Sequence, residues 1–167
     1  MSPKPQLKSA KPTVFIDGEA GTTGIEIRDR LAKVPAIEMR SIAAEKRKDP
    51  AARQDLMREV DLVVLCLPDD AAKEAVALAD ALGNDGPRIV DASSAHRVSD
   101  GWVFGLPELD PGHAEVIAGA RRVTNPGCYP TGGIALLRPL VAKGLIPADY
   151  PVAVNAVSGY SGGGKSM

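Results

Sequence analysis

Apolar residues along the chain gather in short runs bounded by Gly, Pro and Asp, and these runs have the length of β-strands. Stretches with helical spacing lie between most of them, and the stretch 49–60 opens with Asp49-Pro50, an N-cap followed by proline at the first helical position. Strands that alternate with helices predict an α/β fold with a mostly parallel sheet and helices on both faces. The predicted strands cover residues 13–17, 37–42, 61–67, 88–91, 122–125 and 152–157, and a further helix covers 69–82.

The first predicted strand runs into a glycine-rich turn that opens a helix. Glycines at 18, 21 and 24 give the pattern G-x-x-G-x-x-G, which is one residue longer in its first half than the common dinucleotide fingerprint. A strand, a glycine turn and a helix in this order form the Rossmann-type layout that holds a pyrophosphate at the helix N-terminus. We therefore interpret the turn as a nucleotide-binding element, with a purely structural turn as the alternative.

The end of the second predicted strand bears on which dinucleotide is bound. An NAD enzyme usually places an acid there for the ribose 2′-hydroxyl, whereas this chain has Ser41 and, after Glu45, the run Lys46-Arg47-Lys48. A hydroxyl and cations suit a 2′-phosphate, so we predict NADP(H) as the cofactor. The basic run could also be a solvated loop that leads into the next helix.

Cys128 follows one predicted strand and opens a predicted helix, within the run Asn125 to Gly133. Helix N-terminal N–H groups and the helix dipole favour the thiolate, which is the nucleophilic form of cysteine. A buried structural cysteine is the alternative. Together with a nucleotide-binding turn, an activated thiol indicates redox chemistry on an acyl group.

Composition narrows the class of partner. The 20 Lys and Arg residues balance 21 Asp and Glu residues, so no overall field favours nucleic acid or an anionic membrane, and a small molecule is the expected partner. Cys66, inside an apolar run, and Cys128 cannot build a disulfide framework, which indicates a cytoplasmic protein. Nothing in the sequence approaches a membrane span, and we predict no metal site.

A Walker-type pattern, G-x-x-x-x-G-K-[ST], runs from Gly159 to Ser166. One interpretation is a P-loop phosphotransferase that uses Lys165, with Asp91 available to hold Mg²⁺. P-loops normally follow the first strand of their fold, where this chain already has its glycine turn. We therefore favour a glycine-rich loop that brings backbone N–H groups and Ser158 or Ser161 towards a substrate or nicotinamide. A non-catalytic NADP-binding fragment is a third possibility.

Five stretches, in this order, resemble the N-acetyl-gamma-glutamyl-phosphate reductases of arginine biosynthesis in their shorter form, which are related to aspartate-semialdehyde dehydrogenases. The resemblance covers nearly the whole chain after its first dozen residues. The matching stretches are Asp17 to Gly24, Asp91 to Arg97, Gly105 to Glu108, Asn125 to Thr131 and Ser158 to Lys165.

The resemblance implies NADPH-dependent reduction of N-acetyl-L-glutamyl 5-phosphate to the 5-semialdehyde, through a thioester on Cys128 as the catalytic residue. Arg97 is a suitable fork for a phosphate, although a surface ion pair is an alternative role. The predicted cofactor-binding residues are Gly18, Gly21, Thr22, Thr23, Gly24, Ser41, Lys46, Arg47, Leu67, Pro68, Ser93, Ser161 and Gly162. The predicted substrate-binding residues are Ser94, Arg97, Asn125, Ser158 and Lys165.

The same resemblance bears on domain organisation, because members of this family are about twice as long and would place the acid–base histidine beyond residue 167. We expect a disordered leader at 1–12, a dinucleotide-binding domain at 13–127 and the beginning of an α+β substrate domain at 128–167. We also expect the full-length protein to be a homo-oligomer. His113 is interpreted as a surface helix residue, and His96 lies in a long loop at 92–112 that contains a short strand.

Overall fold

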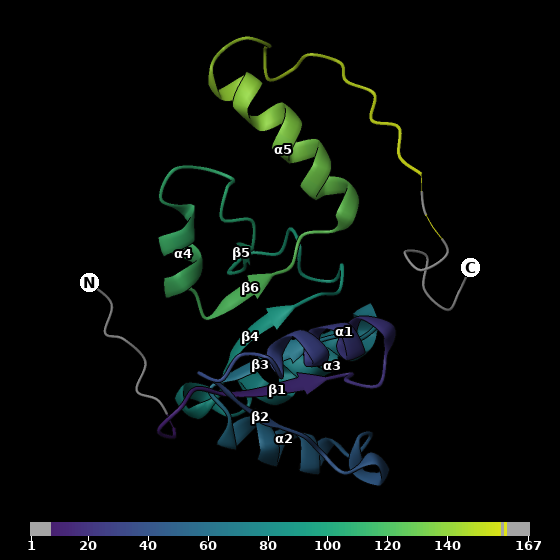
Figure 1. Ribbon diagram of the computed structural model, residues 1–167, viewed down its shortest axis with the longest axis vertical. Helices are drawn as coiled ribbons and strands as arrows, with labels where there is room; N and C mark the ends of the chain where they lie inside the picture. The colour runs from purple at the N-terminus through teal and green to yellow at the C-terminus, as the bar shows by residue number, and fades with distance from the viewer. Residues whose placement is uncertain (1–7, 158, 160–167) are drawn as a thin grey trace.

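Six strands form one parallel sheet in the order β2-β1-β3-β4-β6-β5 (Figure 1). The computed structural model describes residues 8–157 and 159. Every strand pair among these residues is parallel, as the alternation of strands and helices predicted. The strands are β1 (Thr13–Asp17), β2 (Glu38–Arg40), β3 (Leu62–Leu65), β4 (Arg88–Asp91), β5 (Val103–Phe104) and β6 (Arg122–Thr124).

Helices connect these strands. The Asp49 side chain accepts hydrogen bonds from the Ala51 and Ala52 backbone N–H groups, so this aspartate caps the next helix as its sequence predicted. The α-helices are α1 (Thr22–Leu31), α2 (Pro50–Glu59), α3 (Asp69–Asp80), α4 (His113–Gly119) and α5 (Cys128–Ala142), with 3-10 turns η1 (Ala44–Lys46) and η2 (Gly83–Asp85). No helix in the described part of the chain is both long enough and apolar enough to cross a membrane.

Helices cover both faces of the sheet because successive strand residues point in opposite directions. Phe15 points to the face covered by α2 and α3, where it packs with Met57 and the small residue Ala75. Val14 and Ile16 point to the opposite face of the sheet, which α1 covers. Burial on both sides explains why β3, Leu62–Leu65, is a continuous apolar run, and it confirms the predicted arrangement.

The strand order reverses at β1, because β2 lies on one side of it and β3 on the other. In open α/β sheets, ligands bind at such a point, outside the carboxyl ends of the strands. Gly18 follows β1 here with a φ of +93°, and a Cβ at this position would lie 2.3 Å from the Cys66 carbonyl oxygen. Only glycine therefore lets the turn pack against the end of β3.

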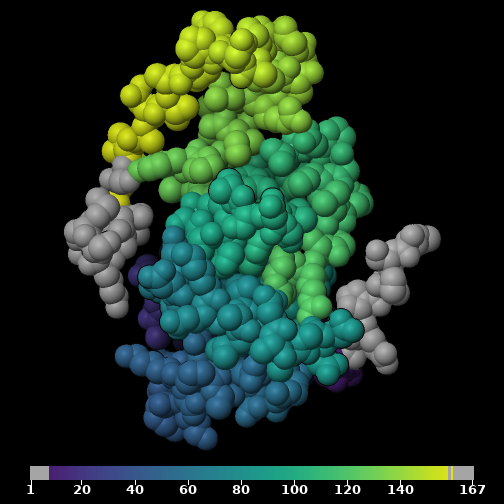
Figure 2. Space-filling model, turned by 180° about the vertical axis from the view of Figure 1, so that it is seen from behind, coloured from purple at the N-terminus to yellow at the C-terminus, as the bar shows by residue number. Residues whose placement is uncertain are grey.

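α5 and the segment that follows it stand away from the sheet, at one end of the molecule (Figures 1 and 2). Arg138 of α5 pairs with Asp110, which lies in the loop before α4. The prediction of a strand at 152–157 is wrong. These residues have no regular structure and are exposed, with Val157 96% exposed. Among the residues that the structure describes, no strand lies beside them to satisfy their backbone groups.

Two lysines of the predicted leader contact the nucleotide-binding part of the chain. The Lys8 backbone N–H donates to Asp61 Oδ1 over 2.8 Å, and Lys11 Nζ donates to the Pro35 carbonyl over 2.8 Å. Burial and the neighbouring Arg121 and Arg58 lower the pKa of Lys8, although Asp61 and Asp85 act against them. Residues 1–7 of this leader lie outside the described residues.

Candidate active site and cofactor-binding turn

The glycine turn is tight, and its construction leaves the start of α1 open. The Gly21 N–H donates to the Gly18 carbonyl over 3.0 Å, and a Cβ on Gly24 would lie 2.2 Å from that same carbonyl oxygen. Gly21 is the N-cap of α1 and has no side chain with which to cap the first-turn N–H groups. The N–H groups of Thr22 and Thr23 are therefore placed to meet an anion, and the turn fits a dinucleotide pyrophosphate.

A cavity of about 140 Å³ lies beside this turn at the end of β1. Ile42 and Leu67 give it apolar walls, while Glu19 and Arg47 provide charged ones. An apolar slot with a few polar groups is typical of a site for a ring-containing ligand. Leu67 thus lies where a cofactor-binding residue was expected, and Pro68 follows as the N-cap of α3.

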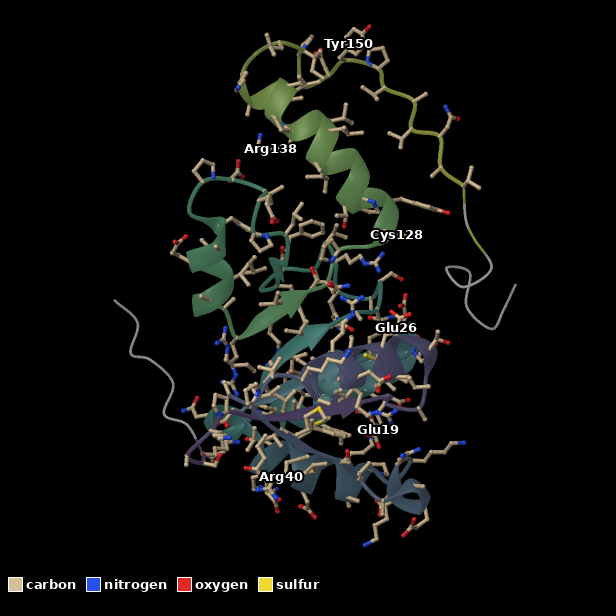
Figure 3. The ribbon with its side chains drawn as sticks, in the orientation of Figure 1. Glu19, Glu26, Arg40, Cys128, Arg138 and Tyr150 are labelled. Carbon is tan, nitrogen blue, oxygen red and sulfur yellow. The ribbon has the colours of Figure 1, made fainter. Side chains whose placement is uncertain are left out.

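A carboxylate joins the turn to the segment that follows β2. Glu19 Oε2 accepts a hydrogen bond of 2.9 Å from Ser41 Oγ, and its Oε1 accepts one of 2.8 Å from Arg47 Nη2. The Glu19 side chain is buried, and Figure 3 shows it at the edge of the sheet near α2. Two of the three residues expected to bind a 2′-phosphate, Ser41 and Arg47, therefore already share one acidic partner. Lys46 is exposed.

A second ion pair, buried on both sides, supports the start of the turn. Arg53 of α2 donates to Asp17 Oδ2 through Nε and Nη2, over 3.0 and 2.6 Å. Burial raises the pKa of Asp17, and the hydrogen bonds and charge of Arg53 partly offset this. Because Asp17 is the last residue of β1, the pair fixes the point where the chain leaves the sheet to enter the glycine turn.

Asp91, at the end of β4, is the centre of a buried hydrogen-bond network. Its Oδ1 accepts from the Ser93 N–H over 2.9 Å, and its Oδ2 accepts from Ser93 Oγ over 2.7 Å. The same Oδ2 lies 2.6 Å from Nδ1 of His96, whose ring stacks on Trp102 with centroids 4.3 Å apart. Asp91 is fully buried, so this network holds the loop from Ala92 to Arg97 in one conformation.

That loop carries Arg97 to the start of α5. A Cβ on Gly127 would lie 2.8 Å from Arg97 Nη1, so the guanidinium packs directly against the residue that precedes Cys128. Arg97 Nη2 donates weakly to the Ala92 carbonyl over 3.4 Å, and Nε is buried with no partner among the described residues. Cys128 is exposed and is the first residue of α5, at the end of that helix nearest the sheet (Figure 3).

The other thiol lies in a different environment. Cys66 follows β3, partly buried against the α1 side of the sheet. Burial, together with the nearby carboxylates of Asp17 and Asp91, raises the pKa of Cys66 to about 11. This thiol is therefore protonated at neutral pH and is a poor nucleophile.

Comparison with known families then identifies the relatives of the chain. Residues 13–117 match the family described as semialdehyde dehydrogenase, NAD binding domain, and residues 128–167 match the semialdehyde dehydrogenase dimerisation domain. The chain belongs to the semialdehyde dehydrogenase family. The division between domains at residue 127 is not tested by these matches and stays a prediction.

Similar curated proteins bear the name that the motifs of this chain suggested. An N-acetyl-gamma-glutamyl-phosphate reductase from Chelativorans sp. (strain BNC1) is 57% identical over 154 residues, which cover 92% of this chain and 49% of the relative. N-acetyl-gamma-glutamyl-phosphate reductase 2 from Nostoc sp. (strain PCC 7120) is 56% identical over 157 residues, or 94% of this chain and 48% of that protein. The resemblance is confirmed, and the chain spans about half the length of these curated relatives.

Solved structures share the fold at lower identity. An aspartate semialdehyde dehydrogenase from Candida albicans, solved with NADP, superposes with a TM-score of 0.59 at 20% identity over 80% of this chain and 48% of that one. Aspartate semialdehyde dehydrogenase II from Vibrio cholerae, complexed with ASA, gives a TM-score of 0.58 at 18% identity, over 80% and 43%. These similarities confirm the Rossmann-type fold.

The predicted site residues form two groups. The first surrounds the glycine turn and includes Ser41, Arg47 and Leu67. The second joins the loop after β4 to the start of α5, where the Asn125 N–H donates to the Asp91 carbonyl over 2.7 Å. Ser158, Ser161, Gly162 and Lys165, and most of the Walker-type pattern, lie outside the described residues.

Ser94 and Ser93 were both predicted to contact ligands, but they have different hydrogen-bond partners. Its hydroxyl donates to Asp69 Oδ2 over 2.7 Å, and its N–H donates to Asp69 Oδ1 over 3.0 Å. These hydrogen bonds from Ser94 lower the pKa of Asp69, which is the first residue of α3. The pair therefore links the loop to α3.

Sequence reasoning missed Glu19 and Arg53, and it considered Asp91 only as a possible holder of Mg²⁺. In the sequence, Glu19 was visible as an acid inside the glycine turn, but its partners follow it by 22 and 28 residues. His113 does begin a helix as expected, and its Nε2 also lies 2.7 Å from the Phe104 carbonyl oxygen. Within the described part of the chain, no three His, Cys, Asp or Glu side chains gather in a way that could hold a metal ion.

Proposed function

We propose that this chain binds NADPH and carries the nucleophile of an N-acetyl-gamma-glutamyl-phosphate reductase, in which Cys128 attacks the acyl phosphate. The observation that carries the proposal is the exposed thiol of the first residue of α5, which follows directly on Gly127, the residue against which Arg97 packs. An accessible thiol can reach a substrate, and the nearby guanidinium can bind the phosphoryl group of that substrate. The names of relatives that match over more than nine-tenths of this chain supply the substrate.

The reaction that follows has two chemical stages. Cys128 Sγ attacks the acyl carbon of N-acetyl-L-glutamyl 5-phosphate, and phosphate leaves as the thioester forms. Bound NADPH supplies the hydride that reduces the thioester carbonyl. The resulting thiohemiacetal on Cys128 then collapses, which releases the 5-semialdehyde and returns the thiol. Arg97 would bind the phosphoryl group, because a guanidinium forms paired hydrogen bonds with phosphate oxygens.

The cofactor assignment rests on residues of the turn and on the relatives. The family match is to an NAD binding domain, and a structural relative was solved with NADP. In our proposal, Gly21 to Gly24 hold the pyrophosphate at the start of α1, while Leu67 borders the adenosine. Ser41 and Arg47 are proposed to bind the 2′-phosphate. Ser93, which Asp91 holds at the carboxyl end of β4, would face the nicotinamide side.

α5 supports a further proposal, that the reductase is a homo-oligomer. Leu136 is 75% exposed and Leu145 is 66% exposed, and both lie on or just after a helix that stands away from the sheet. Exposed apolar side chains concentrated on one element mark a surface that binds another protein surface. The match of residues 128–167 to a dimerisation domain agrees with this assignment.

The test is to trap the acyl group on the enzyme in the absence of cofactor. The protein is mixed with freshly prepared N-acetyl-L-glutamyl 5-phosphate, and its peptides are examined by mass spectrometry for an added N-acetylglutamyl group that hydroxylamine removes. We expect the group on the peptide that contains Cys128, and we expect Cys128→Ser to lose it while Cys66→Ser retains it. Acylation that persists in Cys128→Ser would refute the assignment.

A second arm of the same test addresses Arg97. The trapped amount is measured at increasing acyl phosphate concentration in the wild type and in Arg97→Ala. Losing a charge-assisted hydrogen bond to phosphate should raise the concentration that gives half-maximal trapping by tenfold or more. An unchanged concentration dependence would remove Arg97 from the phosphate site while leaving the role of Cys128 intact.

A further inference from the structure

Glu19 contacts the segment that follows β2, and its place in the sequence does not predict this contact. It lies two residues beyond β1, and both of its carboxylate oxygens accept hydrogen bonds from the segment that follows β2, one from Ser41 and one from Arg47. β1 and β2 are parallel neighbours, with Phe15 opposite Arg40, so the two segments leave the sheet at the same edge. The chain therefore has an acid at the end of β2, although that acid comes from the glycine turn.

This location matters because the end of the second strand is where a Rossmann-type domain contacts the adenosine ribose. Glu19 and Arg47 both line the cavity beside the turn, together with Ile42 and Leu67. A carboxylate here can accept a hydrogen bond from a ribose 2′-hydroxyl. A 2′-phosphate, by contrast, would bring two negative charges to donors that already serve a carboxylate.

We propose that Glu19 is a specificity-determining residue that competes with the 2′-phosphate of NADP(H) for Ser41 and Arg47. The inference rests on the proposed dinucleotide function of the turn and defines which dinucleotides it accepts. Binding of NADPH requires the Glu19 carboxylate to give up both donors, whereas NADH can bind with the Glu19, Ser41 and Arg47 contacts intact. The preference for NADPH is therefore weaker than Ser41 and Arg47 alone would produce, and both cofactors bind.

The experiment measures dissociation constants of NADPH and NADH, by the fluorescence of the reduced nicotinamide, for the wild type and for Glu19→Gln. The amide keeps the size of the side chain, removes its charge and can donate to a phosphate. We expect the ratio of the NADH to the NADPH dissociation constant to rise at least about tenfold, mainly through tighter NADPH binding. A ratio that stays constant or falls would overturn the inference, because a purely positioning role predicts weaker NADPH binding.

Glu26→Gln is the matched control. Glu26 is exposed on α1, and Figure 3 shows it apart from Glu19, so this variant removes an equal charge from the same domain. We expect its ratio to equal that of the wild type. A rise equal to that of Glu19→Gln would show a general charge effect and would overturn the inference.

A second set of variants separates competition from other causes. In an Arg47→Ala background, Glu19→Gln should give much less than its tenfold change, because the donor being contested is gone. Glu19→Asp has a side chain one methylene shorter, which is too short to reach both donors. We expect it to raise the ratio of the NADH to the NADPH dissociation constant, as Glu19→Gln does. This variant tests the inference if Glu19→Gln does not fold. Equal effects of Glu19→Gln in both backgrounds would refute competition.

The same titrations distinguish this inference from the proposed function. A wild-type protein that binds neither NADPH nor NADH would overturn both. Binding by the wild type with no selectivity change in Glu19→Gln or Glu19→Asp would overturn the role of Glu19 alone.

Discussion

Selective alkylation of the two thiols tests the assignment of the nucleophile without requiring turnover. Iodoacetamide reacts with thiolates, so its rate follows the ionised fraction and the accessibility of each sulfur. Burial and the nearby carboxylates raise the pKa of Cys66 to about 11. At pH 8 about one Cys66 side chain in a thousand is then ionised. Cys128 is exposed at the start of α5, so we expect it to react first by a wide margin.

The assay is a time course at pH 8, in which each cysteine peptide is quantified by mass spectrometry. We expect Cys128 to be modified at least about tenfold faster than Cys66, because Cys128 is exposed and the raised pKa of Cys66 leaves few Cys66 thiolates to react. Urea should abolish the difference by exposing Cys66. Equal rates in the folded protein would refute the assignment of Cys128, as would faster modification of Cys66.

Three further predictions follow from the same contacts. Gly18→Ala should destabilise the protein by more than about 2 kcal/mol in urea unfolding, whereas Gly101→Ala, at a similar φ of +80° but in open space, should cost less. Asp91→Asn should cost about 1.5–3 kcal/mol, because the Ser93 hydroxyl and His96 would face an amide N–H group in place of an acceptor. Between pH 9 and pH 11 the unfolded Cys66 thiol ionises before the folded one, so stability should fall by about 2 kcal/mol more in the wild type than in Cys66→Ser.

The strands that the sequence predicted correctly are those buried on both faces. β1 and β4 begin and end at the predicted residues, because in each strand an apolar centre follows a proline and ends at an aspartate. The run at 61–67 was predicted too long, since Leu67 lines the cavity beside the turn and does not pair in the sheet. The run at 152–157 has the same apolar pattern but no neighbouring strand among the described residues. Hydrophobic patterning thus locates segments that can form strands, while pairing decides which of them do.

Candidate chemistry was predictable where it depended on local sequence. The glycine turn and Cys128 could each be recognised because a strand precedes them and a helix follows or begins at them. The contacts of Glu19 depend instead on which strands are neighbours, because only the parallel pairing of β1 with β2 brings Ser41 and Arg47 to the turn. Sequence spacing alone gave those two residues the role of binding a 2′-phosphate, and it could not reveal that a carboxylate already occupies them.

The register of the sheet also explains why the two thiols have different surroundings. Asp17, Leu65 and Asp91 lie side by side at the carboxyl ends of β1, β3 and β4, so Cys66 follows directly between two carboxylates. Its carbonyl packs against Gly18, and its thiol is held in the protonated form. Beyond β6 the chain instead continues through Pro126 and Gly127 before α5 begins, and Gly127 packs against Arg97. Cys128 is therefore exposed at the start of a helix, whereas Cys66 is partly buried between two carboxylates, and this difference in surroundings is why we propose Cys128 and not Cys66 as the nucleophile.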